Sequence, residues 1–278
     1  MGPRPPMQEP GFETITFTSG DGTPLAGWIY RPPGRKTGSG TVILSHGFCD
    51  HSGSLGTAAR ELSTQHGLVA LAFDHRLHGS SEDHIPSFGG QESFDIQAAL
   101  DFADRVGLPR PYLLHGTSLG ALAAQRAGIK DPRVAGLFLV ACPGWPWDAI
   151  GVMSRISQQR LMLPAGNLVN LYYGWDVLND GDIRRHRQPE SHTPFVCYVM
   201  GEADCFGVSK TRLVYDHWQG AGAENRFPSE TPGGQKWFWT LPQVVHPGTP
   251  GPQVWEWSGY GRLQQEFFER VLTGGIAG

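Results

Sequence analysis

The chain has 278 residues, of which 39% are hydrophobic and 17% are charged, and its formal net charge is −4. This length and composition are typical of a folded protein with a well-buried core and exclude a disordered chain. The mildly acidic balance does not imply the strongly basic face that binds phosphates, so nucleic acid is not an expected partner.

Three further features bear on the cellular compartment. Residues 1–11 are rich in proline and glycine and lack the apolar core of a signal peptide. No stretch approaches the roughly 20 apolar residues that a membrane-spanning helix requires. The cysteines form no Cys-x-x-Cys pair, which favours free, partly buried thiols over a disulfide; they are Cys49, Cys142, Cys197 and Cys205. We therefore expect a soluble, cytoplasmic protein without a membrane span.

The first predicted elements form a hairpin. Phe12–Ser19 alternates apolar and polar residues, and Leu25–Tyr30 follows a Gly-Asp-Gly turn at Gly20–Gly22. Alternation on both sides of a turn predicts an antiparallel pair at the edge of a sheet.

Short apolar runs and helical segments then alternate along the chain. The runs suit strands buried on both faces of a parallel sheet, and they are Thr41–Ser45, Leu68–Phe73, Tyr112–Leu114, Val134–Ala141, Phe195–Met200 and Lys236–Leu241. The segments with helical spacing are Leu55–Gln65, Ser93–Arg105, Leu119–Lys130 and Gly261–Leu272. This order predicts βαβ units, and hence an α/β fold with a mostly parallel central sheet and helices on both faces.

The segment from Trp145 to Thr193 departs from this alternation of strands and helices, because it has short helical patches and no clear strand. We predict a core formed by residues 1–144 and 194–278, with residues 145–193 inserted as a small helical cap. Aromatic side chains in this cap suit an apolar or aromatic-walled pocket, although they equally suit packing of the cap on the core. The candidate pocket residues are Trp145, Trp147, Tyr172 and Trp175.

The candidate nucleophile is Ser118, in Gly116-Thr117-Ser118-Leu119-Gly120. This Gly-x-Ser-x-Gly lies directly after a predicted buried strand and directly before an alanine-rich helix. A serine on such a tight strand-to-helix turn projects clear of the sheet, and the flanking glycines leave room for the turn. The helix N-terminus behind it favours developing negative charge.

A serine hydroxyl needs a base, and His246 is the best placed of the eleven histidines. It follows Lys236–Leu241 in a loop rich in proline and glycine, from which it can reach back to Ser118. A solvated loop residue is the alternative interpretation of His246. His192 and His217, in or beside predicted helical or cap regions, are weaker candidates.

The third member must be an acid at another strand end. Asp204 lies in a tight turn just past Phe195–Met200 and is the predicted orienting residue. Glu202, two residues earlier, is its rival.

Acyl transfer also needs hydrogen-bond donors for an oxyanion. His46-Gly47-Phe48 closes the buried strand that begins at Thr41, and a turn there exposes backbone N–H groups. We predict the N–H groups of Phe48 and Leu119 as the two donors. His46 is expected to be a structural histidine that bonds the backbone of its own loop.

These motifs together resemble the α/β-hydrolase superfamily over nearly the whole chain, in the chain order Ser, Asp, His. A further stretch, Asp74 to Ser81, resembles the Asp-x-Arg-x-x-Gly-x-Ser turn of the monoacylglycerol-lipase and serine-aminopeptidase-like branch, which implies structural roles for Asp74 and Arg76. Two departures are an insertion around Gly220–Gln235 and the run Pro247–Pro252 after the histidine.

The resemblance implies a serine hydrolase with a catalytic triad of Ser118, His246 and Asp204, and no metal or other cofactor. We expect a small-molecule carboxylic ester as substrate, with a short- to medium-chain or aromatic acyl group. Thioesters, amides or peptides and carbon–carbon bonds are alternative substrates for the same triad, and a non-catalytic ligand receptor uses the same fold. Epoxide hydrolases and haloalkane dehalogenases are disfavoured because they have a carboxylate where this chain has Ser118.

Overall fold

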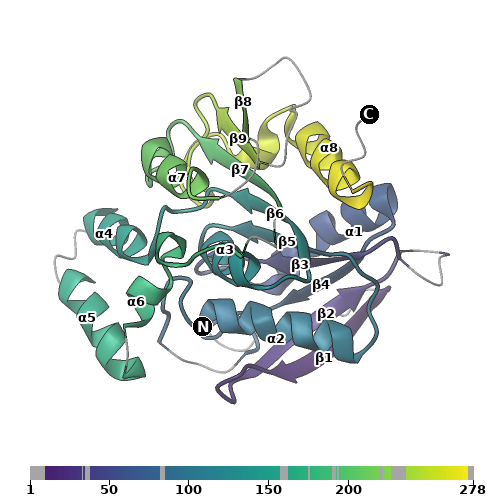
Figure 1. Cartoon of the computed structure of the whole chain (residues 1–278), viewed down its shortest axis with the longest axis horizontal. Coiled ribbons are helices and arrows are strands. Elements are labelled where there is room, and N and C mark those ends of the chain that lie inside the picture. The colour runs from purple at the N-terminus through teal and green to yellow at the C-terminus, as the bar shows by residue number, and fades with distance from the viewer. Residues whose placement is uncertain are drawn as a thin grey trace.

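The computed structural model describes residues 10–32, 34, 38–81, 85–156, 162–174, 176–189, 192, 194–218, 222–226 and 236–274. Within these residues nine strands form one sheet in the order β1-β2-β4-β3-β5-β6-β7-β9-β8 (Figure 1). The strands are β1 (Phe12–Thr18), β2 (Pro24–Tyr30), β3 (Thr41–Ser45), β4 (Val69–Phe73), β5 (Tyr112–Thr117), β6 (Val134–Val140), β7 (Phe195–Gly201), β8 (Gly222–Arg226) and β9 (Lys236–Leu241).

Most of the sheet is parallel, as the sequence predicts. The predicted hairpin is present as β1 and β2, which pair antiparallel at one edge, and β2 also pairs antiparallel with β4. All pairs from β4 to β8 are parallel. Consequently the carboxyl ends of β3, β5, β6, β7 and β9 meet at the same end of the sheet, where α/β proteins bind their ligands.

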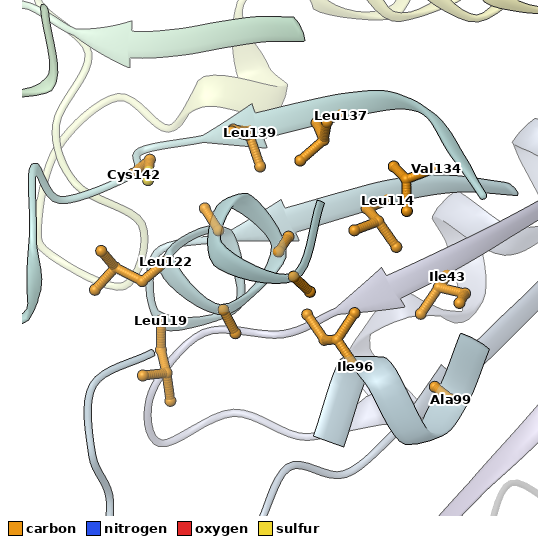
Figure 2. Close-up of a cluster of buried hydrophobic side chains, with 14 of the residues drawn as sticks. Ile43, Ile96, Ala99, Leu114, Leu119, Leu122, Val134, Leu137, Leu139 and Cys142 are labelled. Carbon is orange, nitrogen blue, oxygen red and sulfur yellow. The ribbon is translucent and has the colours of Figure 1, made fainter. Parts of the chain in front are cut away.

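Successive side chains of the central strands point to opposite faces of the sheet, so each face has its own hydrophobic core. In β3, for example, Ile43 belongs to one core, whereas Val42 and Leu44 belong to the other. The helices α2 (Glu92–Arg105), α3 (Leu119–Lys130) and α7 (Val208–Tyr215) cover the first face, and α1 (Gly56–His66) and α8 (Tyr260–Leu272) cover the second. Figure 2 shows side chains of α2, α3 and the strands meeting in the first core. The predicted helices on both faces are therefore confirmed.

The segment after β6 contains α4 (Pro146–Ile156), α5 (Met162–Tyr173), α6 (Val177–Asp180) and the short 3-10 helix η2 (Ile183–Arg185). These helices lie together beside the sheet, at the left of Figure 1. An ion pair between Arg126 and Asp180 ties α6 to α3, and the Tyr173 hydroxyl donates a hydrogen bond to the carbonyl of Ile85.

One strand is absent from the prediction. The inserted stretch around Gly220–Gln235 contributes β8, which pairs with β9 at the far edge of the sheet. Its sequence, Gly-Ala-Glu-Asn-Arg, contains no apolar run, because an edge strand needs a partner on one side only and does not have to be buried on both faces.

Two smaller predictions can be compared with the structure. All four cysteines are free, with Cys142 and Cys197 buried and Cys49 and Cys205 exposed. Among the described residues, no helix is both long and apolar enough to cross a bilayer.

Candidate active site

Ser118 occupies a sharp turn between β5 and α3. Its backbone has φ 53° and ψ −111°, a conformation that side-chain-bearing residues rarely adopt and that costs about 1–3 kcal/mol. The Ser118 N–H donates to the carbonyl of Val140 at 2.9 Å, which fastens the turn to β6. The side chain is partly exposed, so the hydroxyl lies at the rim of the sheet and is open to a ligand.

The two glycines of the motif allow close backbone approach. A Cβ atom on Gly116 would lie 2.5 Å from the carbonyl oxygen of Gly120, and one on Gly120 would lie 2.3 Å from the carbonyl oxygen of Ser45. Real Cβ atoms do not approach backbone so closely. The glycines therefore let α3 begin directly against β5 and against the loop after β3.

We expect Gly120→Ala to destabilise the fold by about 2–3 kcal/mol, because the new methyl group meets fixed backbone at Ser45 and His46. Urea unfolding measures the effect. The matched control is Gly261→Ala in α8, where a Cβ meets nothing within 4 Å and helix propensity favours alanine. Equal stabilities of the two variants would contradict the close approach described here.

The structure brings Ser118, His246 and Asp204 into one hydrogen-bonded line. The Nε2 of His246 lies 2.9 Å from the Oγ of Ser118, and its Nδ1 lies 2.9 Å from the Oδ2 of Asp204. An ionised carboxylate only accepts, so Nδ1 carries the proton and donates to Asp204. The lone pair of Nε2 is then directed at the serine hydroxyl. These residues follow β5, β9 and β7, whose carboxyl ends are close together in the sheet.

Asp204, and not Glu202, faces the histidine. The side chain of Asp204 is fully buried, and its second oxygen, Oδ1, accepts the N–H of Phe206 at 2.9 Å. Glu202 is exposed on the turn after β7, and its N–H donates to the carbonyl of Leu241 at 2.9 Å. The geometry thus separates two candidates that the sequence left open.

The competing histidines have other partners. His192 contacts the carbonyl of Gly128 at 2.8 Å, and His217 contacts the carbonyl of His186 at 2.8 Å. Neither bond involves Ser118.

The loop after β3 borders the serine. A Cβ on Gly47 would lie 3.6 Å from the Cβ of Ser118, so the backbone of His46-Gly47-Phe48 passes alongside it. Leu119 begins α3 on the other side of the serine. Within the described part of the chain, no acceptor takes a hydrogen bond from the N–H of Phe48 or of Leu119. Both N–H groups are therefore free to donate to a ligand.

His46 has the structural role that the sequence predicts. Its Nδ1 lies 2.8 Å from the carbonyl of Gly47, and its Nε2 accepts the N–H of His75 at 3.0 Å. Burial, together with the charge of neighbouring His75, holds the pKa of His46 well below its ordinary value. The ring is therefore neutral and ties the loop after β3 to the turn after β4.

The Asp74–Ser81 turn is held by its charged side chains. The carboxylate of Asp74 accepts the N–H of Ser52 at 2.6 Å and that of Ser80 at 2.7 Å. The guanidinium of Arg76 is fully buried and pairs with Asp95 and Asp21. Both residues have the structural roles that the sequence predicts for them.

Three neighbours of the site are absent from the prediction. The ring of Phe206 packs edge-on against His246, with centroids 4.6 Å apart, and Phe88 packs on Phe48 at 5.7 Å. His78 accepts the N–H of Cys49 through Nε2 at 3.1 Å. His78 stands at a variable position of the Asp-x-Arg-x-x-Gly-x-Ser stretch, so the sequence places it in this turn but does not indicate its role. No sequence motif indicates Phe206 or Phe88.

The candidate pocket residues lie in different surroundings. Trp145 is half-buried beneath the guanidinium of Arg184, 3.6 Å above its ring, and half-buried Trp147 packs against the first core. Tyr172 is 53% exposed and packs edge-on against Tyr173. Trp175 lies outside the described residues.

Comparison with known proteins places the chain in a family. Residues 37–191 match the family model of the serine aminopeptidases, S33. The matched range includes Ser118 and the loop after β3. No curated protein matches the chain.

Solved structures of α/β hydrolases resemble it throughout. The esterase Pf2001 of Pyrococcus furiosus is 18% identical with a TM-score of 0.67, covering 96% of this chain and 98% of its own. The α/β hydrolase GrgF from Penicillium sp. sh18 is 19% identical with a TM-score of 0.62, covering 94% and 99%. Est1E from Butyrivibrio proteoclasticus, solved with ferulic acid, is 17% identical with a TM-score of 0.63, covering 95% and 100%. At these identities the likeness establishes the fold, and the family match over more than half of the chain establishes membership: the protein belongs to the serine aminopeptidase S33 family of α/β hydrolases.

Proposed function

We propose that this hydrolase cleaves carboxylic esters with short- to medium-chain or aromatic acyl groups, through an acyl-enzyme on Ser118. The observation that carries the proposal is the line of two 2.9 Å contacts from Ser118 through His246 to Asp204. A serine hydroxyl with a histidine lone pair directed at it is an activated nucleophile.

The mechanism follows from the positions of the protons. Nε2 of His246 takes the proton of Ser118 as Oγ attacks the acyl carbonyl, and Asp204 stabilises the imidazolium that forms. Phe48 and Leu119 donate their N–H groups to the oxyanion of the tetrahedral intermediate. His246 then gives its proton to the leaving alcohol. Water, activated by the same nitrogen, attacks the acyl-enzyme and releases the acid.

Aromatic side chains support an apolar acyl pocket. Phe48 and Phe88 pack together beside the proposed oxyanion loop, and half-buried Trp147 packs against the same core. We propose residues 145–193 as the cap that bounds this pocket, with Trp145, Trp147, Tyr172 and Trp175 as candidate lining residues. Est1E, which shares the fold, binds ferulic acid, an aromatic carboxylic acid, and this supports an aromatic acyl group here.

A series of p-nitrophenyl esters tests the substrate class. We expect kcat/KM to be highest from acetate to octanoate and to fall for palmitate, because a pocket bounded by packed aromatic rings has limited length. The corresponding p-nitroanilides and thioesters serve as matched substrates for the alternative activities. Turnover restricted to long acyl chains, or faster cleavage of the anilide than of the ester, would contradict the proposal.

His78 is expected to position the oxyanion donor. Its Nε2 holds the N–H of Cys49, the residue after Phe48, while its Nδ1 lies 2.8 Å from the carbonyl of Arg76. We expect His78→Leu to lower kcat by about 100-fold with little change in KM, because displacing the Phe48 N–H by about 1 Å weakens transition-state binding.

His78→Gln is the matched control, since its Oε1 can accept from Cys49 where Nε2 does. Steady-state kinetics of both variants should show kcat recovered to within a few-fold of wild type in the glutamine variant. Equal losses in the two variants would mean that His78 only fills space.

A further inference from the structure

Three different metal-ligating groups lie together beside Ser118: the carboxylate of Asp204, the thiol of Cys205 and the imidazole of His246. One ligating atom from each residue lies within 4.8 Å of the other two. Asp204 is buried and His246 is 9% exposed, whereas Cys205 is exposed and its thiol is free. The proposed mechanism uses the carboxylate and the imidazole but has no role for the thiol.

The separations suit a tetrahedral metal ion. His246 Nδ1 and Asp204 Oδ2 are 2.9 Å apart. Nitrogen and oxygen ligands of one tetrahedral Zn²⁺ lie about 3.3 Å apart, and nitrogen and sulfur ligands about 3.5 Å apart, given the usual bond lengths. The pair needs to open by only a few tenths of an ångström. The Sγ of Cys205 lies within 4.8 Å of both atoms and would move closer to them to bind the same ion.

Two carboxylates lie near the thiol of Cys205. Burial, followed by the carboxylates of Asp204 and Asp148, raises the pKa of the Cys205 thiol to about 11. The Oδ2 of Asp148 is buried and has no hydrogen-bond partner in the described part of the chain, although its other oxygen pairs with Lys210. Such a site disfavours a free thiolate but attracts a cation, and a bound metal ion removes the thiol proton itself.

We propose that Asp204, Cys205 and His246 form an inhibitory site for Zn²⁺ or a similarly thiophilic divalent ion. The metal takes the place of the proton on Nδ1 of His246, that proton is replaced by one on Nε2 so that the imidazole stays neutral, and the thiol proton leaves to solvent. A neutral imidazole that holds a metal on Nδ1 carries its own proton on Nε2. That nitrogen then donates to Ser118 and cannot accept its proton, so catalysis stops. The inhibition rests on the proposed function; the binding does not.

The ligand set selects the kind of metal. Thiolate and imidazole together favour Zn²⁺, whereas Mg²⁺ and Ca²⁺ require mostly oxygen ligands. We therefore expect Mg²⁺ to leave the enzyme unaffected at concentrations at which Zn²⁺ inhibits it.

The first test is Zn²⁺ inhibition of ester hydrolysis by the full chain without a histidine tag, each variant being compared with its own metal-free rate. We expect Cys205→Ser to weaken the inhibition constant by at least about tenfold. Cys49→Ser, at the other exposed cysteine, should keep the wild-type inhibition constant, and EDTA should restore activity. Equal inhibition of the wild type and Cys205→Ser would overturn the proposal.

The second test does not depend on activity. Co²⁺ bound to a thiolate absorbs in the near ultraviolet through sulfur-to-metal charge transfer. The band should appear in the wild type and in Ser118→Ala, and should be absent from Cys205→Ser. A wild type without the band, or a band that persists in Cys205→Ser, would overturn the site. An enzyme inactive on every ester would contradict the proposed function alone, and the Co²⁺ result would still decide the metal site.

Discussion

Ester hydrolysis is expected to fall by about 10⁶-fold in kcat when alanine replaces Ser118, which is the order of magnitude that loss of a triad nucleophile costs. The substitution removes the Oγ that lies 2.9 Å from Nε2 of His246, and with it the atom on which the acyl-enzyme is proposed to form. KM should change little, because the proposed acyl pocket and the two proposed backbone donors remain. Steady-state kinetics with a p-nitrophenyl ester measures the effect.

Ser209→Ala is the matched control for this experiment. Ser209 is exposed on α7 and lies three residues after Phe206, whose ring packs against His246. We expect wild-type kinetics from this variant and wild-type circular dichroism from both. A Ser118→Ala enzyme that retained more than a small fraction of the wild-type rate would contradict the assignment of the nucleophile.

The second large effect is expected at the orienting carboxylate. Asp204→Asn should lower kcat by about 10⁴-fold, because an amide can present its NH₂ to Nδ1 and so stabilise the wrong tautomer of His246. It also removes the negative charge that stabilises the imidazolium. The substitution keeps the size of the side chain, and the acceptor for the Phe206 N–H can remain.

Glu202→Gln is the matched control, because Glu202 is the other acid in the turn after β7. Glu202 is exposed, and the contact it makes through its backbone N–H survives the substitution. Its kcat should stay within about twofold of wild type, as is typical of surface substitutions. A large loss in Glu202→Gln with a small one in Asp204→Asn would reverse the assignment of the acid, and pre-steady-state kinetics would show whether acylation is the step affected.

Much of the fold can be predicted from the sequence, because the central strands are buried on both faces. Runs such as Thr41–Ser45 must be apolar along their whole length, and this makes them visible without any partner. A single α-helix follows each of the strands β3, β4 and β5 before the next strand begins. The predicted bounds therefore agree with those of the structure to within a few residues, as for Leu119–Lys130.

The edge of the sheet is different. β8 is polar and short, and its identity as a strand depends on pairing with β9. No local pattern encodes that pairing, so the stretch around Gly220–Gln235 could be predicted only as an insertion.

The residues of the candidate site also differ in how far the sequence predicts them. Ser118 has a local signature because its turn requires glycine on both sides, and His246 and Asp204 could be placed by their positions after strands. The place of Asp204 in the tight turn after β7 favours it over Glu202, but the inward orientation of its carboxylate is seen only in its contact with His246. The support from His78 and Phe206 likewise depends on contacts across the site between segments that are distant in sequence.

The most direct test of an activated serine is covalent labelling by a fluorophosphonate probe. The wild type and Ser118→Ala would be labelled in their folded states, and the modified peptide identified by mass spectrometry. We predict one modified residue in the wild type, Ser118, and no label in the alanine variant, because only a serine paired with His246 attacks the probe readily. A folded wild type that takes up no label, or that takes it up elsewhere, would contradict the assembly of Ser118, His246 and Asp204 as a working triad.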